Sequence, residues 1–275
     1  MAEKIALSAA IRSNLLTLQR TIDLGDRTQV RLASGLKVNS ALDDAAAFFA
    51  ARALSFRADD LGRLKDNIDQ SISTLQAAIQ GIESITQLVE QAQGIAITAK
   101  ATGDTNERSS LAVQFDALLV QINQLANDAS YQGQNLIQAA PDNLVVDFNE
   151  DASSQLTVVG IDSTTGTGGV NVAGAVGNFA AATNIDIALT ATRNALITLR
   201  TSAATLGSNN SVLQTRLKFT EDLVNTLDEG AGKLTLADLN EESANLLSLQ
   251  TRQQLGLNSL SLAAQSERAI LNLFG

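Results

Sequence analysis

Apolar residues in the first part of this chain recur at alternating intervals of three and four positions, which is the spacing of a helix with one narrow buried stripe. The stripe consists of the apolar or small residues Ile11, Leu15, Leu18, Ile22, Gly25 and Leu32. The Ser34–Gly35 pair predicts the end of this helix, because Gly commonly follows a helix C-terminus. Ser40 and Asp43 then have the spacing of a capping box and predict the start of the next helix.

Two further helices are predicted before the middle of the chain. The first has eleven seam intervals over 38 residues, a mean of about 3.5, which is the coiled-coil repeat. Its seam is Leu61, Leu64, Ile68, Ile72, Leu75, Ile79, Ile82, Ile85, Val89, Ala92, Ala96 and Ala99. The TGDTN segment at 102–106 interrupts this helix, and a third helix follows, with Leu111, Phe115, Leu118, Ile122, Leu125 and Ala129 on its seam.

The clearest repeat begins at Ile185 and alternates intervals of four and three as far as Leu227. Asn210 lies on this seam, where a buried polar residue fixes the register of a coiled coil; a polar residue tolerated at a loose contact explains it equally well. The DEGAGK segment at 228–233 predicts the end of this helix, and a last helix is predicted from about Thr235. Its stripe is Leu246, Leu249, Leu260, Ala263, Ile270 and Phe274, with Leu247, Leu255, Leu262 and Leu273 beside it. One neighbouring face cannot bury all of these residues.

The stretch from Tyr131 to about Thr183 lacks a helical period and contains Gly, Ser, Thr, Val and the single proline, Pro141. LVVDF at 144–148 and QLTVVGI at 155–161 predict a β-hairpin. The Gly-rich residues that follow predict a loop or a very small lobe. The predicted fold is therefore mainly α, with long antiparallel coiled-coil helices and a small β-hairpin and Gly-rich tip.

Composition narrows the classes of function. The formal net charge of −10 argues against a nucleic-acid partner, because phosphate binding needs clustered Lys and Arg. The chain has no Cys and no His, so thiolate metal sites and the usual general base near neutral pH are absent. No apolar run reaches the roughly 18 residues of a membrane span. Polar residues interrupt the apolar character of the N-terminus, so no signal peptide is expected.

Segments that resemble known ligand-binding motifs lack one or more of the residues that those motifs require. A phosphate loop ending at Leu234 would need Ser or Thr there and Gly where Leu227 stands. A calcium loop beginning at Asp147 would need Gly and Glu where Ala152 and Val158 stand. Adjacent aspartates elsewhere point apart on a helix and cannot share a proton. We therefore expect no catalytic site, no metal site and no cofactor, and a protein that is not an enzyme.

Motifs at both ends of the chain resemble those of one family. RLASGLKVNSALDDAAAFFAARAL at 31–54 is similar to the bacterial flagellin pattern of a helix followed by SSGLRINSAxDDAAGLAI. YQGQNLI at 131–137 looks like the family's FNGxxLL. LQTRLKFTEDLVNTLD at 213–228 resembles the LQNRLxFTxxNLxN segment of the same family. The residues from Ala237 onward resemble its C-terminal helix, most closely that of the α-proteobacterial branch. Two departures are Phe48 and Phe49, where the family has small or aliphatic residues, and LADLN at 236–240 in place of DADYA.

The resemblance implies a structural subunit that self-assembles into the bacterial flagellar filament, the propeller of motility. It places residues 1–33 and 238–275 in the D0 helices that line the filament bore, with connectors at 34–43 and 228–237. Residues 44–140 and 184–227 would form the D1 helical bundle, and 141–183 the reduced outer domain. A related hook–filament junction protein is an alternative, and a cytoplasmic coiled-coil adaptor is a third hypothesis that leaves the two terminal signatures unexplained.

The resemblance also implies partners and the residues that meet them. The implied contacts with other copies of the chain are Ile11, Leu15, Leu18, Ile22, Leu32, Leu246, Leu249, Leu260, Ile270 and Phe274. The implied connector residues are Ser34, Gly35, Asn39, Ser40, Asp43 and Asp44. Hook-junction and cap proteins are further implied partners. A flagellar export chaperone would cover Leu246, Leu249, Leu260 and Leu262 before export through the flagellar channel without a cleaved signal peptide.

Two implied features concern the outside of the filament. Family members are often O-glycosylated on outward Ser and Thr, for which Ser163, Thr164, Thr165 and Thr167 are candidates; unmodified loop residues explain these four equally well. A host Toll-like receptor reads a stretch that in enteric flagellins looks like LQRVRELAVQ, and this chain offers VEQAQGIAIT at 89–98. Glu90, Gln91, Gln93 and Ile95 stand at the corresponding positions without either Arg, so weak recognition is expected.

Overall fold

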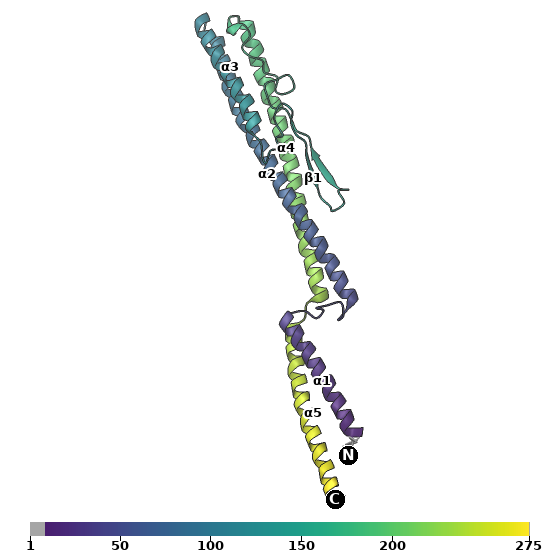
Figure 1. Cartoon of the computed structure of the whole chain (residues 1–275). Helices are drawn as coiled ribbons and strands as arrows, with labels where there is room; N and C mark the ends of the chain where they lie inside the picture. The colour runs from purple at the N-terminus through teal and green to yellow at the C-terminus, as the bar shows by residue number, and fades with distance from the viewer. Residues whose placement is uncertain (1–8, 275) are drawn as a thin grey trace. The chain divides into compact units, whose positions relative to one another are not determined.

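The computed structural model describes residues 9–274, with side chains for 11–266, 268 and 269 (Figure 1). Five long helices and a two-stranded sheet make the chain mainly helical, as predicted. Two compact units are present, one formed by residues 1–57 with 226–275 and the other by residues 58–225. We call them the terminal unit and the central unit. Helices α2 (Ala45–Ala101) and α4 (Ala182–Thr235) each contribute residues to both.

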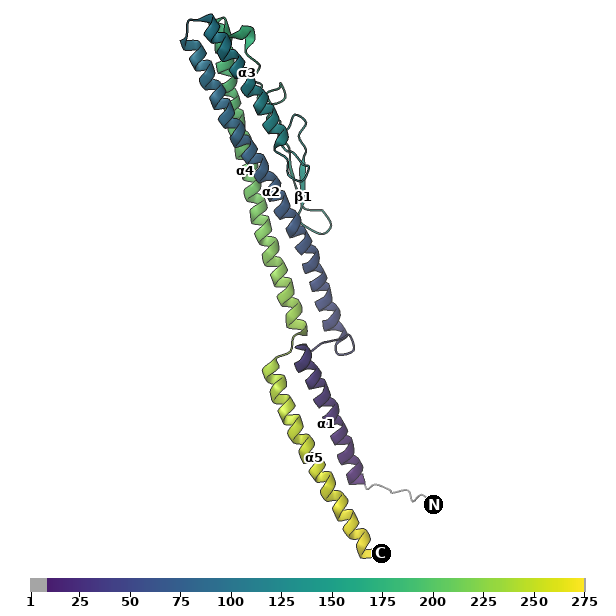
Figure 2. The same cartoon turned by 60° about the vertical axis from the view of Figure 1, so that its left-hand side comes forward.

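In the terminal unit, α1 (Ala9–Ser34) packs along α5 (Leu239–Phe274), and the two helices lie side by side in each view (Figures 1 and 2). Arg31 pairs with Glu242, whereas Leu18 lies close to Gly256. The residue numbers therefore rise along one helix as they fall along the other, and the pair is antiparallel. A Cβ at residue 256 would lie 3.1 Å from Leu18 Cδ1, so Gly256 allows a close approach of the helices.

The predicted end of α1 is confirmed, and the predicted start of α2 is wrong. Gly35 has φ +71° and its N–H donates to the Arg31 carbonyl at 2.8 Å, which ends the helix. Ser40 does not cap α2. The helix begins at Ala45, and the Asp44 carboxylate accepts a hydrogen bond from the Ala47 N–H at 3.0 Å, the bond of a capping residue.

The predicted end of α4 at residues 228–233 is also wrong, because the helix continues to Thr235. Gly within a helix costs about 1 kcal/mol relative to Ala, but Gly230 and Gly232 leave room for neighbouring leucines. A Cβ at residue 232 would lie 3.0 Å from Leu236 Cδ1. The last helix begins at Leu239 rather than near Thr235. Asp238 precedes it, and its carboxylate accepts hydrogen bonds from the N–H groups of Asn240 and Glu241 in the first turn, at 2.9 and 3.2 Å.

The central unit has one continuous apolar core built by α2, α3 (Thr105–Asp128) and α4. Most predicted seam positions are buried, including Ile68, Ile122 and Leu199. On the α4 seam, the Asn210 Oδ1 is buried and has no hydrogen-bond partner among the described residues. The register of the helices is therefore not fixed by a hydrogen bond at this position.

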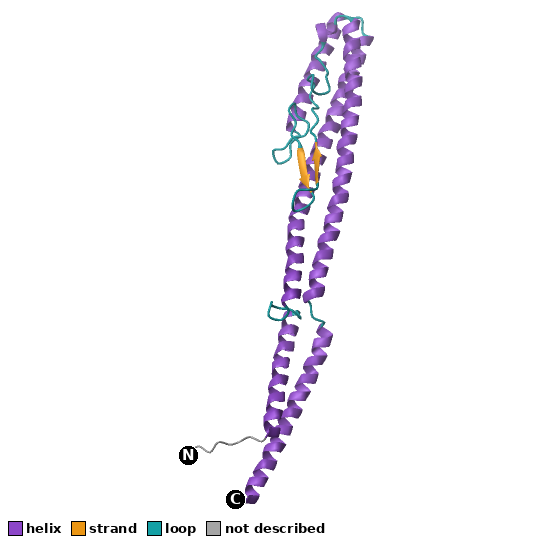
Figure 3. Cartoon of the chain, turned by 90° about the vertical axis from the view of Figure 1, so that its right-hand side faces the viewer, coloured by secondary structure: helices purple, strands orange, loops and turns teal. Residues whose placement is uncertain are grey.

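The hairpin prediction is confirmed by β1 (Leu144–Asp147) and β2 (Gln155–Val158), which are antiparallel with Val145 opposite Thr157. The hairpin lies alongside the helices of the central unit rather than beyond their ends (Figure 3). A short 3-10 helix, η1 (Val176–Phe179), follows, and the rings of Phe115 and Phe179 meet edge to face at 5.3 Å. Buried residues of the 141–183 segment thus join the same core as the helices.

Candidate self-assembly surface

The apolar residues of α1 divide between a buried and an exposed set. Ile11 and Leu18 are buried, and Leu32 is half-buried. Leu15 and Ile22, both on the predicted stripe, remain 37% and 38% exposed. Three residues off the stripe are more exposed still, at 50–53%: Leu16, Leu24 and Val30. The narrow stripe described by the sequence therefore includes the buried residues Ile11 and Leu18, only partly matches the buried face, and omits a second apolar face.

The apolar face of α5 is divided in the same way. Leu246, Leu249 and Leu260 on the predicted stripe are half-buried. The leucines beside it are exposed by half or more: Leu247 at 67%, Leu255 at 63%, Leu257 at 50% and Leu262 at 66%. The side chains of Ile270 and Phe274 lie outside the described residues. Large exposed apolar patches are typical of interaction sites, so this face of α5 is a candidate contact surface.

The two connectors pair with each other inside the terminal unit. Leu36 and Leu236 form an isolated antiparallel bridge. The Lys37 N–H donates to the Thr235 carbonyl at 2.8 Å, and the Ala237 N–H donates to the Gly35 carbonyl at 2.9 Å. This pairing joins the segment that leaves α1 to the segment that enters α5.

The predicted connector residues form one hydrogen-bonded turn. The Asp43 carboxylate accepts from the N–H groups of Asn39 and Ser40 at 3.2 and 3.0 Å and from the Ser40 hydroxyl at 3.1 Å. These hydrogen bonds lower the pKa of Asp43, and the bond from the Ser40 N–H has the largest effect. The guanidinium of Arg27, at 3.9 Å, also lowers this pKa. Ser34 Oγ accepts from the Leu36 N–H at 3.2 Å. The Ser40–Asp43 motif thus shapes the turn before the helix instead of capping it.

One ion pair between α1 and α5 was not predicted from the sequence. Arg31 Nη1 donates to Glu242 Oε1 at 2.9 Å, and the side chains are 39% and 10% exposed. The two residues are 211 positions apart, so neither local spacing nor helical period relates them. A carboxylate buried to this extent is retained where a cation accompanies it.

Comparisons with known proteins give the family. Residues 5–141 match the bacterial flagellin N-terminal helical region, and residues 189–274 match the bacterial flagellin C-terminal helical region. The flagellin FljO of Caulobacter vibrioides is 34% identical over 94% of this chain and 94% of that protein. The chain belongs to the flagellin family. It is a structural subunit of the bacterial flagellar filament and functions outside the cell in motility.

Two other flagellins are similar to this chain. A flagellin of Brucella melitensis is 29% identical over the whole of this chain and 99% of its own length. A crystal structure of Bacillus cereus flagellin is 18% identical, covers 56% of this chain and 88% of its own, and superposes with a TM-score of 0.49. The curated relatives are mostly α-proteobacterial, as the C-terminal residues of the chain predicted.

The candidate glycosylation residues of this flagellin differ in exposure. Ser163 and Thr164 are 1% and 7% exposed, so the expectation that they face outward is wrong. Thr165 is half-buried, and its N–H donates to Asn123 Oδ1 at 2.9 Å. Thr167 is exposed. The Gly-rich sequence indicated an irregular loop, but packing of that loop on the helices buries its first residues.

The stretch aligned with the immune-receptor motif lies on α2. Glu90 and Gln91 are exposed, and Gln93 and Ile95 are half-buried. Arg200 Nη2 lies 3.9 Å from Glu90 Oε1, an exposed ion pair. A partner that approaches this stretch therefore meets a carboxylate and two amides.

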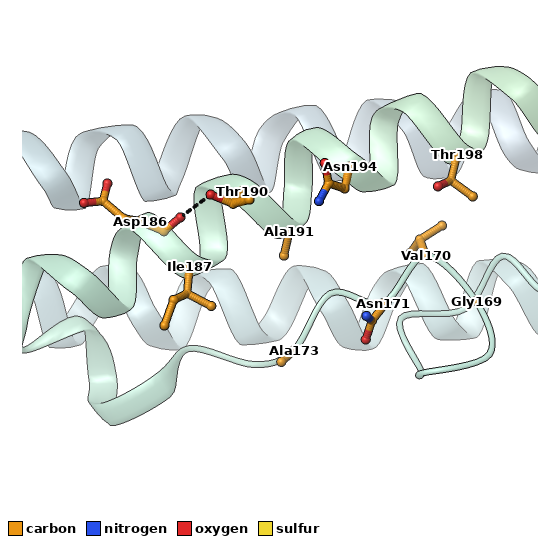
Figure 4. Close-up of a pocket in the computed structure, with 10 residues that line it drawn as sticks. All are labelled: Gly169, Val170, Asn171, Ala173, Asp186, Ile187, Thr190, Ala191, Asn194 and Thr198. Carbon is orange, nitrogen blue, oxygen red and sulfur yellow. Dashed lines mark hydrogen bonds between the residues drawn. The ribbon is translucent and has the colours of Figure 1, made fainter.

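A groove of about 730 Å³ lies between α4 and the 169–173 segment of the central unit (Figure 4). Ile187 and Ala191 give it an apolar side, and Asn171, Asn194 and Thr198 add polar groups. Its one carboxylate, that of Asp186, pairs with Lys100. Within residues 9–274 no three His, Cys, Asp or Glu are grouped to hold a metal ion, and no helix is long and apolar enough to cross a membrane.

Proposed function

We propose that this flagellin joins the filament through the outward apolar faces of α1 and α5, which form the inner D0 layer, while the central helices form the D1 layer. The observation that carries the proposal is the exposure of Leu247, Leu255 and Leu262 on a helix whose other side is already covered by α1. A contact between different surfaces of successive copies repeats without closing and generates a helical fibre.

The predicted connectors at 34–43 and 228–237, the second of which includes the last turns of α4, are proposed to hold the two layers in their order. Pairing of Leu36 with Leu236 supports this role, because it fixes both connectors to each other without a partner subunit. The family's hook-junction and cap proteins are proposed to meet the same terminal helices at the two ends of the filament.

Deletion of either terminal helix tests the proposal. Chains that lack residues 1–30 or 246–275 are expected to remain helical and monomeric, because the central core loses no contact. Far-UV circular dichroism follows the helices, and electron microscopy with sedimentation follows assembly. Long filaments formed by either truncated chain would refute the proposed role of α1 and α5.

Before export, the exposed leucines of α5 are an aggregation hazard, since apolar patches of this kind associate. We propose that an export chaperone covers Leu246, Leu249, Leu260 and Leu262, and that the chain then passes through the flagellar channel without loss of a signal peptide. A pull-down with residues 240–275 is expected to recover a small flagellar protein. N-terminal sequencing of filaments is expected to show that no signal peptide has been removed. A pull-down that recovers no such protein would contradict the chaperone proposal, and a shortened N-terminus would contradict export without cleavage.

Two proposals remain for the filament exterior. Thr167 is the O-glycosylation candidate best supported by exposure, and an intact filament mass equal to the sequence mass would exclude modification. Weak recognition by the host receptor is supported by Glu90, Gln91 and Gln93, because each lost charge-assisted hydrogen bond costs about 1.5–3 kcal/mol. A reporter-cell assay beside an enteric flagellin tests this, and equal potency would contradict it.

A further inference from the structure

The beginning of α2 carries an aromatic cluster that the proposed α1 and α5 contacts do not use. The cluster consists of Phe48, Phe49, Arg52 and Phe56. Phe49 is 62% exposed and Phe56 is 56% exposed, and the rings of Phe48 and Phe49 meet edge to face at 5.5 Å. Three of the eight phenylalanines of the chain lie within these nine residues. Two of them stand where the flagellin pattern has small or aliphatic residues, so the cluster belongs to this chain rather than to the motif.

Arg52 lies among these rings and forms no ion pair with a carboxylate of the described residues. Its Cζ is 5.7 Å from the ring centroid of Phe48 and 5.1 Å from that of Phe56. The described residues provide it with no ion pair. The rings therefore hold an exposed guanidinium in place, and its five donors remain available for a carboxylate. Aromatic residues and Arg are the residue types enriched at the centres of protein interfaces.

A groove of about 300 Å³ adjoins the cluster within the terminal unit. Phe48 and Arg52 line it, Val38, Ala51 and Ala231 give it a buried apolar floor, and the Asp228 carboxylate lies on its α4 side without an ion pair to Arg52 among the described residues. A partner that contacts the rings thus also meets a recessed apolar surface. The combination requires a partner with both apolar side chains and negative charge.

A second copy of this chain meets that requirement, and each subunit of a polymer has such a copy beside it. The terminal unit contains eleven Lys and Arg against eleven Asp and Glu, so it is formally neutral. The central unit contains eight against eighteen and carries the whole net charge of −10. Between Arg108 and Arg193 there are eight carboxylates and no Lys or Arg. Exposed Val113, Val120 and Val145 lie in the same stretch.

We propose that the aromatic cluster of one subunit binds the acidic central unit of a neighbouring subunit, with Arg52 paired to a carboxylate and the Phe rings against its exposed aliphatic residues. This contact rests on the proposed filament assembly and adds a second site to it, on α2 and distinct from α1 and α5.

Critical concentrations for polymerisation of the full chain test the proposal. Phe49→Ala and Phe56→Ala are each expected to raise the critical concentration about tenfold, which corresponds to about 1.4 kcal/mol. Arg52→Glu is expected to raise it at about 0.05 M salt and to have a smaller effect at about 0.5 M, because salt screens an exposed ion pair. Unchanged circular dichroism of the monomers would show that the variants fold.

Two matched variants serve as controls. Phe219→Ala removes a ring that is 58% exposed outside the cluster, and Arg193→Glu makes the same charge change within the acidic unit. Neither is expected to raise the critical concentration. Cluster variants that assemble like the wild type, or controls that weaken assembly equally, would overturn the aromatic contact. The α1 and α5 proposal stands or falls separately, on the truncated chains.

Discussion

The two compact units of this flagellin satisfy their apolar residues to different degrees. In the central unit, the seam residues of α2, α3 and α4 close on one another and on the hairpin, and most are less than 9% exposed. In the terminal unit, α1 and α5 cover one face of each other and leave leucines on the other face at 50–67% exposed. The same heptad-like spacing therefore produces a buried core in the central unit, whereas in the terminal unit one apolar face of each helix stays exposed to solvent.

Charge follows the same division. The formally neutral terminal unit can pack against copies of itself without net electrostatic repulsion, whereas the central unit carries the whole net charge of −10. Burial and charge together make the terminal unit the region that requires neighbours. The following variants test this comparison.

The largest difference is expected for paired core and surface truncations in the monomer. Phe115→Ala removes a fully buried ring of the central unit and should lower the free energy of unfolding by about 3–5 kcal/mol. Leu257→Ala, at a 50% exposed position on α5, should change it by less than about 0.5 kcal/mol. Urea unfolding of both monomers gives the two values. Equal losses would mean that the terminal unit is as closed as the central unit.

Loss of the ion pair between α1 and α5 should have an intermediate effect. Arg31→Ala leaves the Glu242 carboxylate, 10% exposed, without its cation. A hydrogen bond to a charged group contributes about 1.5–3 kcal/mol, and the partial exposure of Arg31 reduces this to about 1 kcal/mol. Hydrogen exchange should rise in α1 and α5 and remain unchanged in α2 and α4. Arg20→Ala, on the exposed side of α1, is the control and should leave all four helices unchanged.

A smaller, stabilising effect is expected inside the central unit. Asn210→Leu removes a buried carbonyl oxygen that has no hydrogen-bond donor, and should raise the free energy of unfolding by about 1 kcal/mol. Thermal unfolding of the monomer measures the change. A loss of stability would show that the amide makes a contact on which the seam depends.

The smallest effect concerns the connector turn and pH. Hydrogen bonds from Ser40 lower the pKa of Asp43, so the folded turn favours the carboxylate. The stabilisation is complete above the ordinary Asp pKa of about 3.9 and is lost as the pH falls through the lowered value. Amide exchange at Asn39 and Ser40 should therefore accelerate in acid, beyond the change in intrinsic rate. Asp43→Asn should abolish that acid dependence, and a dependence that survives the substitution would assign it to another group.

Periodicity predicted most of the fold because each long helix buries a stripe of side chains. The seams of α2 and α4, the hairpin, and the end of α1 at Gly35 all follow from local spacing. On α3 only Phe115 and Ile122 of the predicted seam are buried, and the other buried residues, Ala112, Leu119 and Ala126, each lie one position from a predicted one. The errors occur where two elements compete for the same residues. Gly230 and Gly232 have the character of a helix end, but the space they leave is filled by neighbouring leucines, and the helix continues. Asp44, not Ser40, caps α2, because Ser40 is held in the turn by Asp43.

The exposed apolar face of the terminal unit was predicted in part. The apolar stripe predicted for α5 contains Leu246, Leu249 and Leu260, which are half-buried in the pair with α1. The exposed residues Leu257 on α5 and Leu16 and Leu24 on α1 lie off the predicted stripes. Counting apolar residues around the whole helix, rather than along one stripe, gives a sequence signal for the second face. The Arg31–Glu242 pair has no such signal, since it depends on how two distant helices align. Ser163 was misassigned to the surface because a Gly-rich sequence does not show which of its residues pack inward.

Hydrogen–deuterium exchange of monomer and filament, resolved along the chain, tests the central claim most directly. The account predicts that the core helices of the central unit are protected in both states. It also predicts that α1 and α5 exchange rapidly in the monomer and become protected by several orders of magnitude in the filament. Protection of α1 and α5 in the monomer equal to that of the central core would contradict the account, because the terminal unit would then be complete without its neighbours.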